Sequence, residues 1–239
     1  MTNSPEDLLY FANVKHDIND FKEATDYLKQ LVEMKPKLDK NERKLFGIIY
    51  KDAIDPIRNT LRVLKNATQS ANSTQLEIID EEFKIALSEL ESLCDSALSL
   101  IDNYLQPNAE DVSSKTFYYK LKGDLYRYLY EFKETGKEEL LQSADASYKS
   151  AIEISATELN SQDPIRLGSI LNYAVFLYEH MGKEPEAVDI LKDALNKAQD
   201  ETKSLSDDSK EESLTIINVM HSNLSIWAKE SDGEEEDIQ

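Results

Sequence analysis

The spacing of apolar residues along this chain is helical from end to end. Apolar residues recur at every third or fourth position in nine segments, and no segment alternates apolar and polar residues over the length of a strand. The sequence therefore predicts an all-α fold. The predicted helices cover approximately residues 5–15, 20–34, 40–65, 76–105, 115–133, 138–159, 164–181, 185–203 and 208–229.

Several polar residues are placed to begin or separate these helices. Asp39 is followed three positions later by Glu42, which approximates a capping box, in which each side chain binds the other residue's backbone N–H. Ser113 or Ser114 is placed to cap the helix that follows. The polar run over residues 66–74 predicts a loop.

The composition limits the partners that this protein can attract. Its 239 residues include 47 acidic and 27 basic side chains, and the net charge of −20 opposes attraction to nucleic acids and anionic membranes. No window approaches 18 consecutive apolar residues, and the first residues lack the pattern of a secretory signal. We expect a cytoplasmic protein, with the nucleus as a second location, that binds no nucleic acid and inserts into no membrane.

The residue types of common catalytic and metal sites are scarce. Cys94 is the only cysteine and lies in an apolar helical stretch, which predicts a buried structural thiol rather than a nucleophile. There is no P-loop, nucleophile elbow or H-E-x-x-H motif. We therefore expect no cofactor, no metal ion, no catalytic residue and no enzymatic activity.

The predicted helices follow one another without a change in composition that would mark a domain boundary. We predict one all-helical domain over residues 1–230 and a disordered acidic tail over residues 231–239. Residues 144–155 and 185–198 share the spacing of packed helix pairs, although no strict repeat period emerges. A tetratricopeptide-like array therefore stays open as the alternative architecture.

Three basic residues lie on one predicted helix. Lys51 and Arg58 are seven positions apart, a rotation of about 700°, so they share a face, and Arg62 follows one turn later. Basic residues with this spacing often pair with local acids on a solvated face. The spacing by itself therefore favours no particular ligand.

A second predicted helix carries a matching group. Lys120 and Arg127 repeat the seven-residue spacing, and Tyr128 follows Arg127. If the two helical faces meet, arginine forks, a lysine ammonium and a tyrosine hydroxyl converge in a way that suits a phosphate dianion. Asp124 can pair with Lys120 or Arg127, which keeps ordinary ion pairing open as the alternative.

Two apolar faces near the end of the chain are each interrupted by an asparagine. A buried amide needs hydrogen-bond partners, so Asn172 and Asn223 on opposite sides of a groove could hold the backbone of an extended peptide. The alternative is that both faces belong to the core and that the amides bond locally. The apolar residues of these faces are Leu171, Val175, Tyr178, Ile216, Val219 and Trp227.

Five sequence segments, in order, resemble one known family. The segment KLKGDLYRYLYEF, residues 120–132, is similar to the K-x-K-G-D-x-Y-R-Y pattern of the 14-3-3 phosphopeptide-binding proteins. The other four segments are NERKLFGIIYKDAI, PNAEDVSSKTFYYK, DPIRLGSILNYAVFLYE and SNLSIW. The resemblance covers nearly the whole chain.

This resemblance implies a nine-helix antiparallel bundle that forms cup-shaped dimers and binds phosphoserine or phosphothreonine segments in an amphipathic groove. The implied phosphate-binding residues are Lys51, Arg58, Arg127 and Tyr128, supported by Arg62, Lys120 and Asp124. The implied peptide-backbone residues are Asn172, Asn223, Glu179 and Trp227, and the implied groove wall is Leu171, Val175, Ile216, Val219 and Ile226. The implied dimer seam includes Val14, Ile18, Thr60 and Leu64.

The chain departs from the family pattern in two places that affect these expectations. Asp55 and Pro56 stand where many members have two small residues; Asp55 can draw Arg58 away from a phosphate, and Pro56 can kink the helix. Asp20 stands where the family has an arginine used between subunits. A homodimer, a heterodimer and weakened dimerisation are therefore all open.

The function that we predict is a phosphoserine- or phosphothreonine-dependent adaptor that regulates client proteins in signalling. Its partners would be phosphorylated proteins and a second 14-3-3-like chain. The alternative is a phosphate-independent helical-repeat scaffold in which the departures have disabled the phosphate site. The phosphate dependence of peptide binding separates these two functions.

Overall fold

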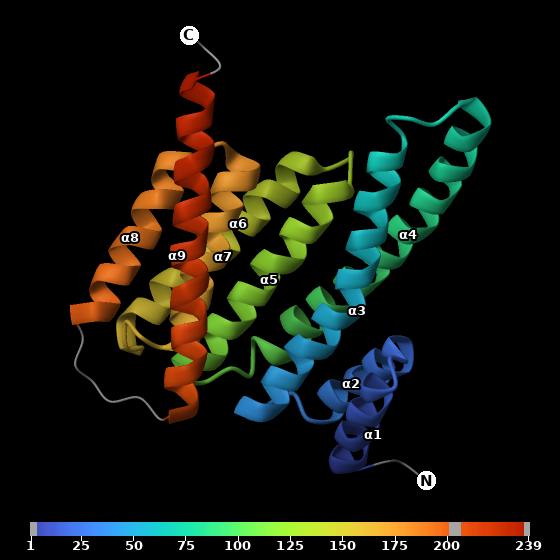
Figure 1. The fold of residues 1–239 in the computed structure, drawn as a ribbon. Helices are drawn as coiled ribbons and strands as arrows, with labels where there is room; N and C mark the ends of the chain where they lie inside the picture. The colour runs from blue at the N-terminus through green and yellow to red at the C-terminus, as the bar shows by residue number, and fades with distance from the viewer. Residues whose placement is uncertain (1–3, 201–206, 237–239) are drawn as a thin grey trace. The chain divides into compact units, whose positions relative to one another are not determined.

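The structure, a computed structural model, describes residues 4–200 and 207–236 (Figure 1). Its helices are α1 (Pro5–Asp17), α2 (Phe21–Met34), α3 (Lys40–Ala67), α4 (Ser73–Leu100), α5 (Val112–Phe132), α6 (Lys137–Glu158), α7 (Pro164–Met181), α8 (Glu184–Asp200) and α9 (Asp207–Glu236). Nine α-helices and no strand occur in these described ranges, which confirms the all-α prediction.

The structure confirms one predicted helix cap and corrects another. The Asp39 carboxylate accepts a hydrogen bond from the Glu42 backbone N–H at 3.0 Å, and the Glu42 carboxylate accepts one from the Asp39 N–H at 2.8 Å. At the start of α5 the cap is Asp111, which accepts from the Ser114 N–H at 2.7 Å. Ser114 was a predicted cap, but α5 begins earlier than predicted, which leaves the capping position to Asp111.

The loop and the long helix that follows it also differ in detail from the prediction. The predicted loop shortens to residues 68–72, because Asn72 forms a capping box with Gln75 and starts α4 early. The last predicted turn of this helix is a π-helical segment, η1 (Ile101–Leu105), closed by a hydrogen bond from the Gln106 N–H to the Ile101 carbonyl at 2.8 Å.

The final helix is longer than the sequence indicated. We expected it to end near Lys229, but α9 continues to Glu236 and includes most of the predicted tail. The helix continues through Asp232 and Gly233, which have low helix propensity, into three glutamates, which have a higher one. Residues 237–239 and the predicted end of α8 near residue 203 lie outside the described residues. No helix in the described part has the length and apolar character to cross a bilayer.

The described residues group into two compact units. The first contains residues 4–110 and 124–144, and the second contains residues 111–123, 145–200 and 207–236. Helices α5 and α6 each contribute residues to both units, so each unit is described by itself. The predictions of a single domain, a cup-shaped subunit and a groove stay predictions.

The first unit is built on four helices of the N-terminal half. Helix α1 packs against α2, and α3 and α4 run side by side as a long helical hairpin (Figure 1). Phe46 and Tyr50 on α3 are fully buried, and the Tyr50 hydroxyl hydrogen-bonds Ser96 at 3.1 Å. Cys94 on α4 is also fully buried, as predicted, and burial raises the pKa of its thiol far above the usual range, so the thiolate is disfavoured.

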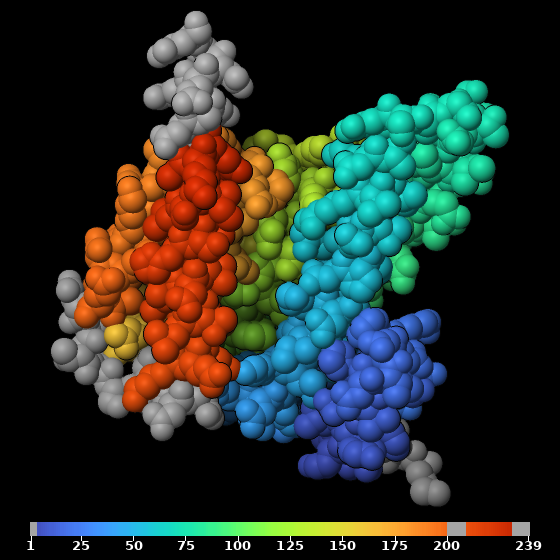
Figure 2. Space-filling model, viewed as in Figure 1, coloured from blue at the N-terminus to red at the C-terminus, as the bar shows by residue number. Residues whose placement is uncertain are grey.

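The second unit is organised around α7, which packs against both α8 and α9. Tyr148 on α6 and Phe176 on α7 are fully buried, with ring centroids 5.6 Å apart. The adjacent Tyr173 hydroxyl donates to the Asp145 carboxylate at 2.9 Å. Figure 2 shows α9 at the surface.

Candidate functional site

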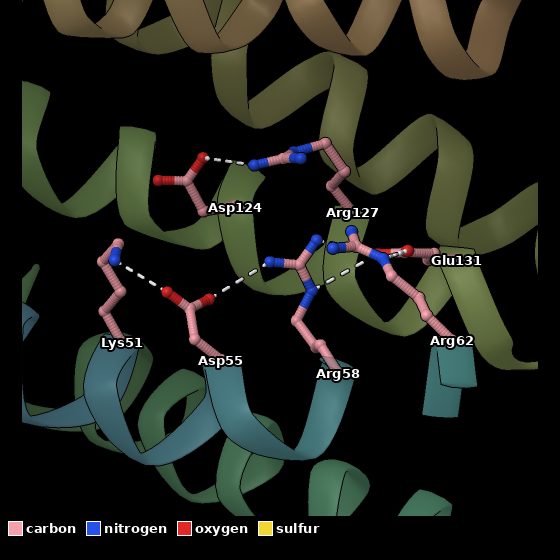
Figure 3. Close-up of polar contacts among 7 residues, drawn as sticks. All are labelled: Lys51, Asp55, Arg58, Arg62, Asp124, Arg127 and Glu131. Carbon is pink, nitrogen blue, oxygen red and sulfur yellow. Dashed lines mark hydrogen bonds and ion pairs between the residues drawn. The ribbon is translucent and has the colours of Figure 1, made fainter. Parts of the chain in front are cut away.

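A charged cluster lies between α3 and α5 within the first unit. Its members on α3 are Lys51, Asp55, Arg58 and Arg62, and its members on α5 are Asp124, Arg127, Tyr128 and Glu131. Figure 3 shows seven of these residues, with the charged ends from the two helices directed toward each other. Because residues three, four and seven positions apart share a helical face, each helix contributes its members from one side.

Tyr128 joins the two predicted basic faces. The Cζ atom of Arg58 lies 3.9 Å from the centre of the Tyr128 ring, and that of Arg127 lies 4.9 Å from it. The electron-rich ring stabilises both guanidinium groups. Tyr128 is buried, and this burial raises the pKa of its hydroxyl well above the usual range. At neutral pH the hydroxyl is therefore protonated and can donate a hydrogen bond.

Arg58 is the most enclosed cation of the cluster, with 7% of its surface exposed. Its Nη2 donates to Glu131 Oε2 at 2.8 Å and its Nε approaches the same oxygen at 3.3 Å. On the other edge, Nη1 lies 3.3 Å from Asp55 Oδ1. A buried charge requires such partners, because its desolvation is otherwise uncompensated. The two carboxylates therefore fix the orientation of the guanidinium plane.

Glu131 is a member of the site that the sequence analysis missed. It accepts hydrogen bonds from Arg58 and also from Arg62 Nε, and it thereby links two arginines of α3 to α5. A signal was present, because Glu131 follows Arg127 by four positions and so lies on the same face of its helix. The sequence pattern did not show which helix that face meets.

The ionisation of Glu131 follows from these contacts. Burial raises the pKa of its carboxyl, but the hydrogen bonds from Arg62 and Arg58 and the charges of these arginines lower it more. The pKa of Glu131 is therefore below the ordinary value of about 4.5. The carboxylate is ionised at neutral pH and contributes to stability in that form.

We expect Glu131→Gln to lower the free energy of unfolding at pH 7 by about 1–2 kcal/mol, because the amide has no negative charge to attract Arg58 and Arg62, and only one of its two ends can accept their hydrogen bonds. A carboxyl with a lowered folded pKa stabilises the protein fully above its unfolded pKa, and this contribution is lost as the pH falls through the folded value. The difference between variant and wild type should therefore shrink below about pH 4.5. Urea titrations from pH 7 to pH 3.5 measure it, and a constant difference would contradict the assignment.

The remaining cations of the cluster are also paired. Lys51 is exposed, and its Nζ lies 2.7 Å from Asp55 Oδ2. Arg127 Nη2 lies 3.7 Å from Asp124 Oδ1, which is one of the two pairings predicted for Asp124. The predicted attraction between Asp55 and Arg58 is present at 3.3 Å. In the group shown in Figure 3, four cations meet three carboxylates, so the group is net positive in a strongly acidic protein.

Pro56 does not interrupt α3. The helix runs from Lys40 to Ala67 with the proline inside it, so the proline leaves one carbonyl without its usual N–H partner. Lys51 and Arg58, on either side of Pro56, both reach the Asp55 carboxylate. The helical spacing on which the basic face depends is therefore preserved.

Lys120 and the predicted peptide-backbone and groove-wall residues belong to the second unit. Lys120 lies beside Gly168 of α7. A Cβ atom added to this glycine would lie 3.6 Å from the Cε atom of Lys120. Asn172 and Asn223 are half-buried on α7 and α9, two helices that pack together. The predicted wall residues on α7 are the half-buried Leu171 and Val175. Those on α9 are the half-buried Ile216 and the exposed Val219 and Ile226.

Trp227 and Glu179 occupy different surroundings in this unit. The Trp227 ring is buried and stacks on Tyr178, with centroids 4.3 Å apart and planes 7° from parallel. The Tyr178 hydroxyl donates to Glu230 at 2.8 Å. Glu179 is exposed. Helices α7 and α9 are therefore joined by an aromatic stack on the side that carries Trp227.

These features define a class of protein: within the described residues, an all-α fold in which arginines of two helices meet at one tyrosine ring. The sequence profile described as 14-3-3 protein matches residues 11–228. Checkpoint signal transducer rad24 of Schizosaccharomyces pombe is 34% identical over 238 residues, which cover 97% of this chain and 87% of that protein.

Two further relatives come from distant organisms. The 14-3-3 protein beta/alpha-A of Xenopus laevis is 32% identical over 234 residues, which cover 97% of this chain and 96% of the relative. The 14-3-3 protein I of Plasmodium falciparum is 33% identical over 239 residues, which cover 96% and 91%. The chain therefore belongs to the 14-3-3 family. This membership supports a role as a phosphopeptide-binding adaptor, and the family's proteins are adaptors rather than enzymes.

Proposed function

We propose that this protein is a phosphoserine- and phosphothreonine-dependent adaptor without enzymatic activity, and that the cluster between α3 and α5 binds the phosphate. The observation that carries the proposal is the placement of Arg58 and Arg127 against the ring of the buried Tyr128. Two guanidinium groups and a protonated hydroxyl at one place can donate several hydrogen bonds to one dianion. The exposed Lys51, which pairs with Asp55, adds a further positive charge at the edge of this group.

We expect a bound phosphate to replace a carboxylate that pairs with a cation of the cluster in the free protein. A phosphate brings up to two negative charges and three acceptor oxygens, whereas each carboxylate in the cluster brings one charge. Arg127 is held by Asp124 at the long distance of 3.7 Å, so this pairing is weaker than that of Arg58 with Glu131. We expect Arg127 to turn toward a phosphate while Glu131 keeps Arg58 in place.

Within the second unit, we propose that Asn172 and Asn223 hold the backbone of the bound peptide, with Glu179 and Trp227 in support. Their half-buried amides on two packed helices support this assignment, because such amides are placed to find N–H and C=O partners. The apolar residues beside them, including the exposed Val219 and Ile226, would receive flanking side chains of the ligand.

We also propose a dimer through the first unit, acting mainly in the cytoplasm and also in the nucleus. The predicted seam residue Ile18 is 63% exposed. Large apolar residues on α1 and α4 are exposed to a similar degree, such as Tyr10 at 65% and Ile85 at 64%. Exposed apolar surface of this extent favours burial against a partner. Asp20 pairs with Lys15 at 3.2 Å within the chain, so it does not need a partner subunit. A single-chain mass in sedimentation equilibrium would contradict the dimer.

Fluorescence anisotropy tests the proposed function with one labelled peptide in phosphorylated and unphosphorylated forms. We expect binding of the phosphorylated form alone. Lys51→Glu reverses a charge, and Arg127→Ala removes a guanidinium group from Tyr128, so each variant should weaken binding by about tenfold or more. Lys29→Glu, a charge reversal at an exposed position of α2, is the matched control and should bind as wild type does.

Equal binding of both peptide forms would favour the helical-repeat scaffold, in which the phosphate site is disabled. Phosphate-dependent binding that survives both Lys51→Glu and Arg127→Ala would place the site elsewhere in the protein. Either result would contradict the assignment to the cluster between α3 and α5.

A further inference from the structure

Asp55 makes contact with two cations of the cluster at once. Its Oδ2 lies 2.7 Å from Lys51 Nζ, and its Oδ1 lies 3.3 Å from Arg58 Nη1 (Figure 3). The residue follows Lys51 by four positions and precedes Arg58 by three, so both cations lie within reach of one carboxylate.

We propose that Asp55 is an internal competitor of the ligand: its carboxylate neutralises the two cations of α3 that a phosphate would use, and thereby lowers the affinity of the site. The proposal rests on the proposed phosphate-binding function and adds a residue that sets its strength. A ligand phosphate has to separate Asp55 from Lys51 and Arg58 before it can bind both cations. After binding, the carboxylate stays close to a dianion and repels it.

The contacts of Arg58 explain why this competition is separable from the architecture of the site. Glu131 binds the Nε and Nη2 edge of the guanidinium, whereas Asp55 binds only Nη1. Removal of the Asp55 carboxylate therefore leaves Arg58 anchored and frees one of its edges for a ligand. Asp55 is partly exposed, with 37% of its side chain accessible, so its replacement leaves no buried cavity.

The same contacts of Asp55 lower the affinity of the site for ligands with a single negative charge. A carboxylate ligand offers the charge that Asp55 already supplies, and it also loses translational freedom on binding. A phosphate dianion offers more charge and more acceptors, so it retains useful affinity against the competitor. Asp55 thus leaves little affinity for ligands with a single negative charge, although it lowers the affinity for a dianion by the larger factor.

Isothermal titration of the full-length protein tests the proposal with the phosphorylated, unphosphorylated and glutamate forms of one peptide. Asp55→Asn should bind the phosphorylated form about fivefold more tightly than wild type, because two ion pairs no longer compete. The gain for the glutamate form should be smaller, since a single charge is repelled less by Asp55. Asp55→Glu keeps a carboxylate within reach of both cations and should stay within about twofold of wild type.

Asp193→Asn is the matched control for the loss of one negative charge. Asp193 pairs with Lys197 four positions away on α8 at 2.6 Å, as Asp55 pairs with Lys51 on α3. This variant should bind as wild type does, which would show that the fivefold gain is local. Circular dichroism and thermal melting confirm that each variant is folded.

The possible results separate this inference from the proposed function. If wild type binds in a phosphate-dependent way and Asp55→Asn binds equally or more weakly, Asp55 positions the cations for the ligand and the competitor role is wrong. If wild type fails to bind and Asp55→Asn binds only the phosphorylated form, the competition is stronger than we infer and the proposal is supported. If neither protein binds the phosphorylated form, the proposed function itself fails, and the inference fails with it.

Discussion

Arg58→Ala should lower the free energy of unfolding by about 3 kcal/mol, more than any other single substitution in the charged cluster of the first unit. Only 7% of the Arg58 residue is exposed, and its guanidinium group contacts Asp55, Glu131 and the Tyr128 ring. Its removal leaves Glu131, whose side chain is only 17% exposed, with one cationic partner instead of two. Urea denaturation followed by circular dichroism measures the loss.

Two variants show whether burial is the cause of this loss. Arg62→Ala removes the same side chain from the same carboxylate, but the Arg62 side chain is 51% exposed, so we expect a loss of less than about 1 kcal/mol. Arg58→Lys keeps the charge but cannot bond Asp55 and Glu131 through a rigid fork, so its loss should be intermediate. Equal losses for Arg58→Ala and Arg62→Ala would contradict the role of burial.

Gly123→Ala should destabilise the second unit by about 3 kcal/mol, because a methyl group does not fit at this point of α5. A Cβ atom added there would lie 2.7 Å from two ring atoms of Tyr148 and 2.9 Å from a third. Tyr148 is fully buried beside Phe176 and Tyr173, so its ring cannot move away without disturbing the aromatic cluster. The gain in helix propensity from alanine, about 1 kcal/mol, does not offset this overlap.

Gly168→Ala is the matched control, since it makes the same change at another buried helical glycine of the same unit. The nearest atoms to its added Cβ would be Lys120 Cε at 3.6 Å and Ile216 Cδ1 at 3.9 Å, both ordinary contact distances. We expect this variant to be as stable as wild type or more stable by up to about 1 kcal/mol. Thermal melting compares the two, and an equal fall in melting temperature for both would contradict the argument from Tyr148.

Several parts of the site could be predicted from the sequence because they depend only on helical spacing. The shared face of Lys51 and Arg58 and the contact between Asp55 and Arg58 follow from separations of seven and three positions. The pairing of Asp124 with Arg127 has the same origin. The capping box of Asp39 was likewise predictable from residues three positions apart.

Other parts of the site could not be predicted because the residues involved are distant in sequence. Glu131 binds Arg58 and Arg62, which precede it by 73 and 69 positions, and no local pattern pairs them. The cap at Asp111 and the extension of α9 to Glu236 were missed for a different reason. Helix ends depend on small differences in capping and propensity, which leave a boundary uncertain by several residues.

The sequence by itself determined the helices, the charged face of each helix, the burial of Cys94 and, through the order of its motifs, the family. These properties follow from periodicity and residue type, which act over a few turns of chain. Only the tertiary structure decided that the two charged faces meet, that Tyr128 contacts both Arg58 and Arg127, and that Glu131 links α5 to α3. Contacts between helices depend on how buried surfaces pack across the core, and helical spacing does not specify this packing.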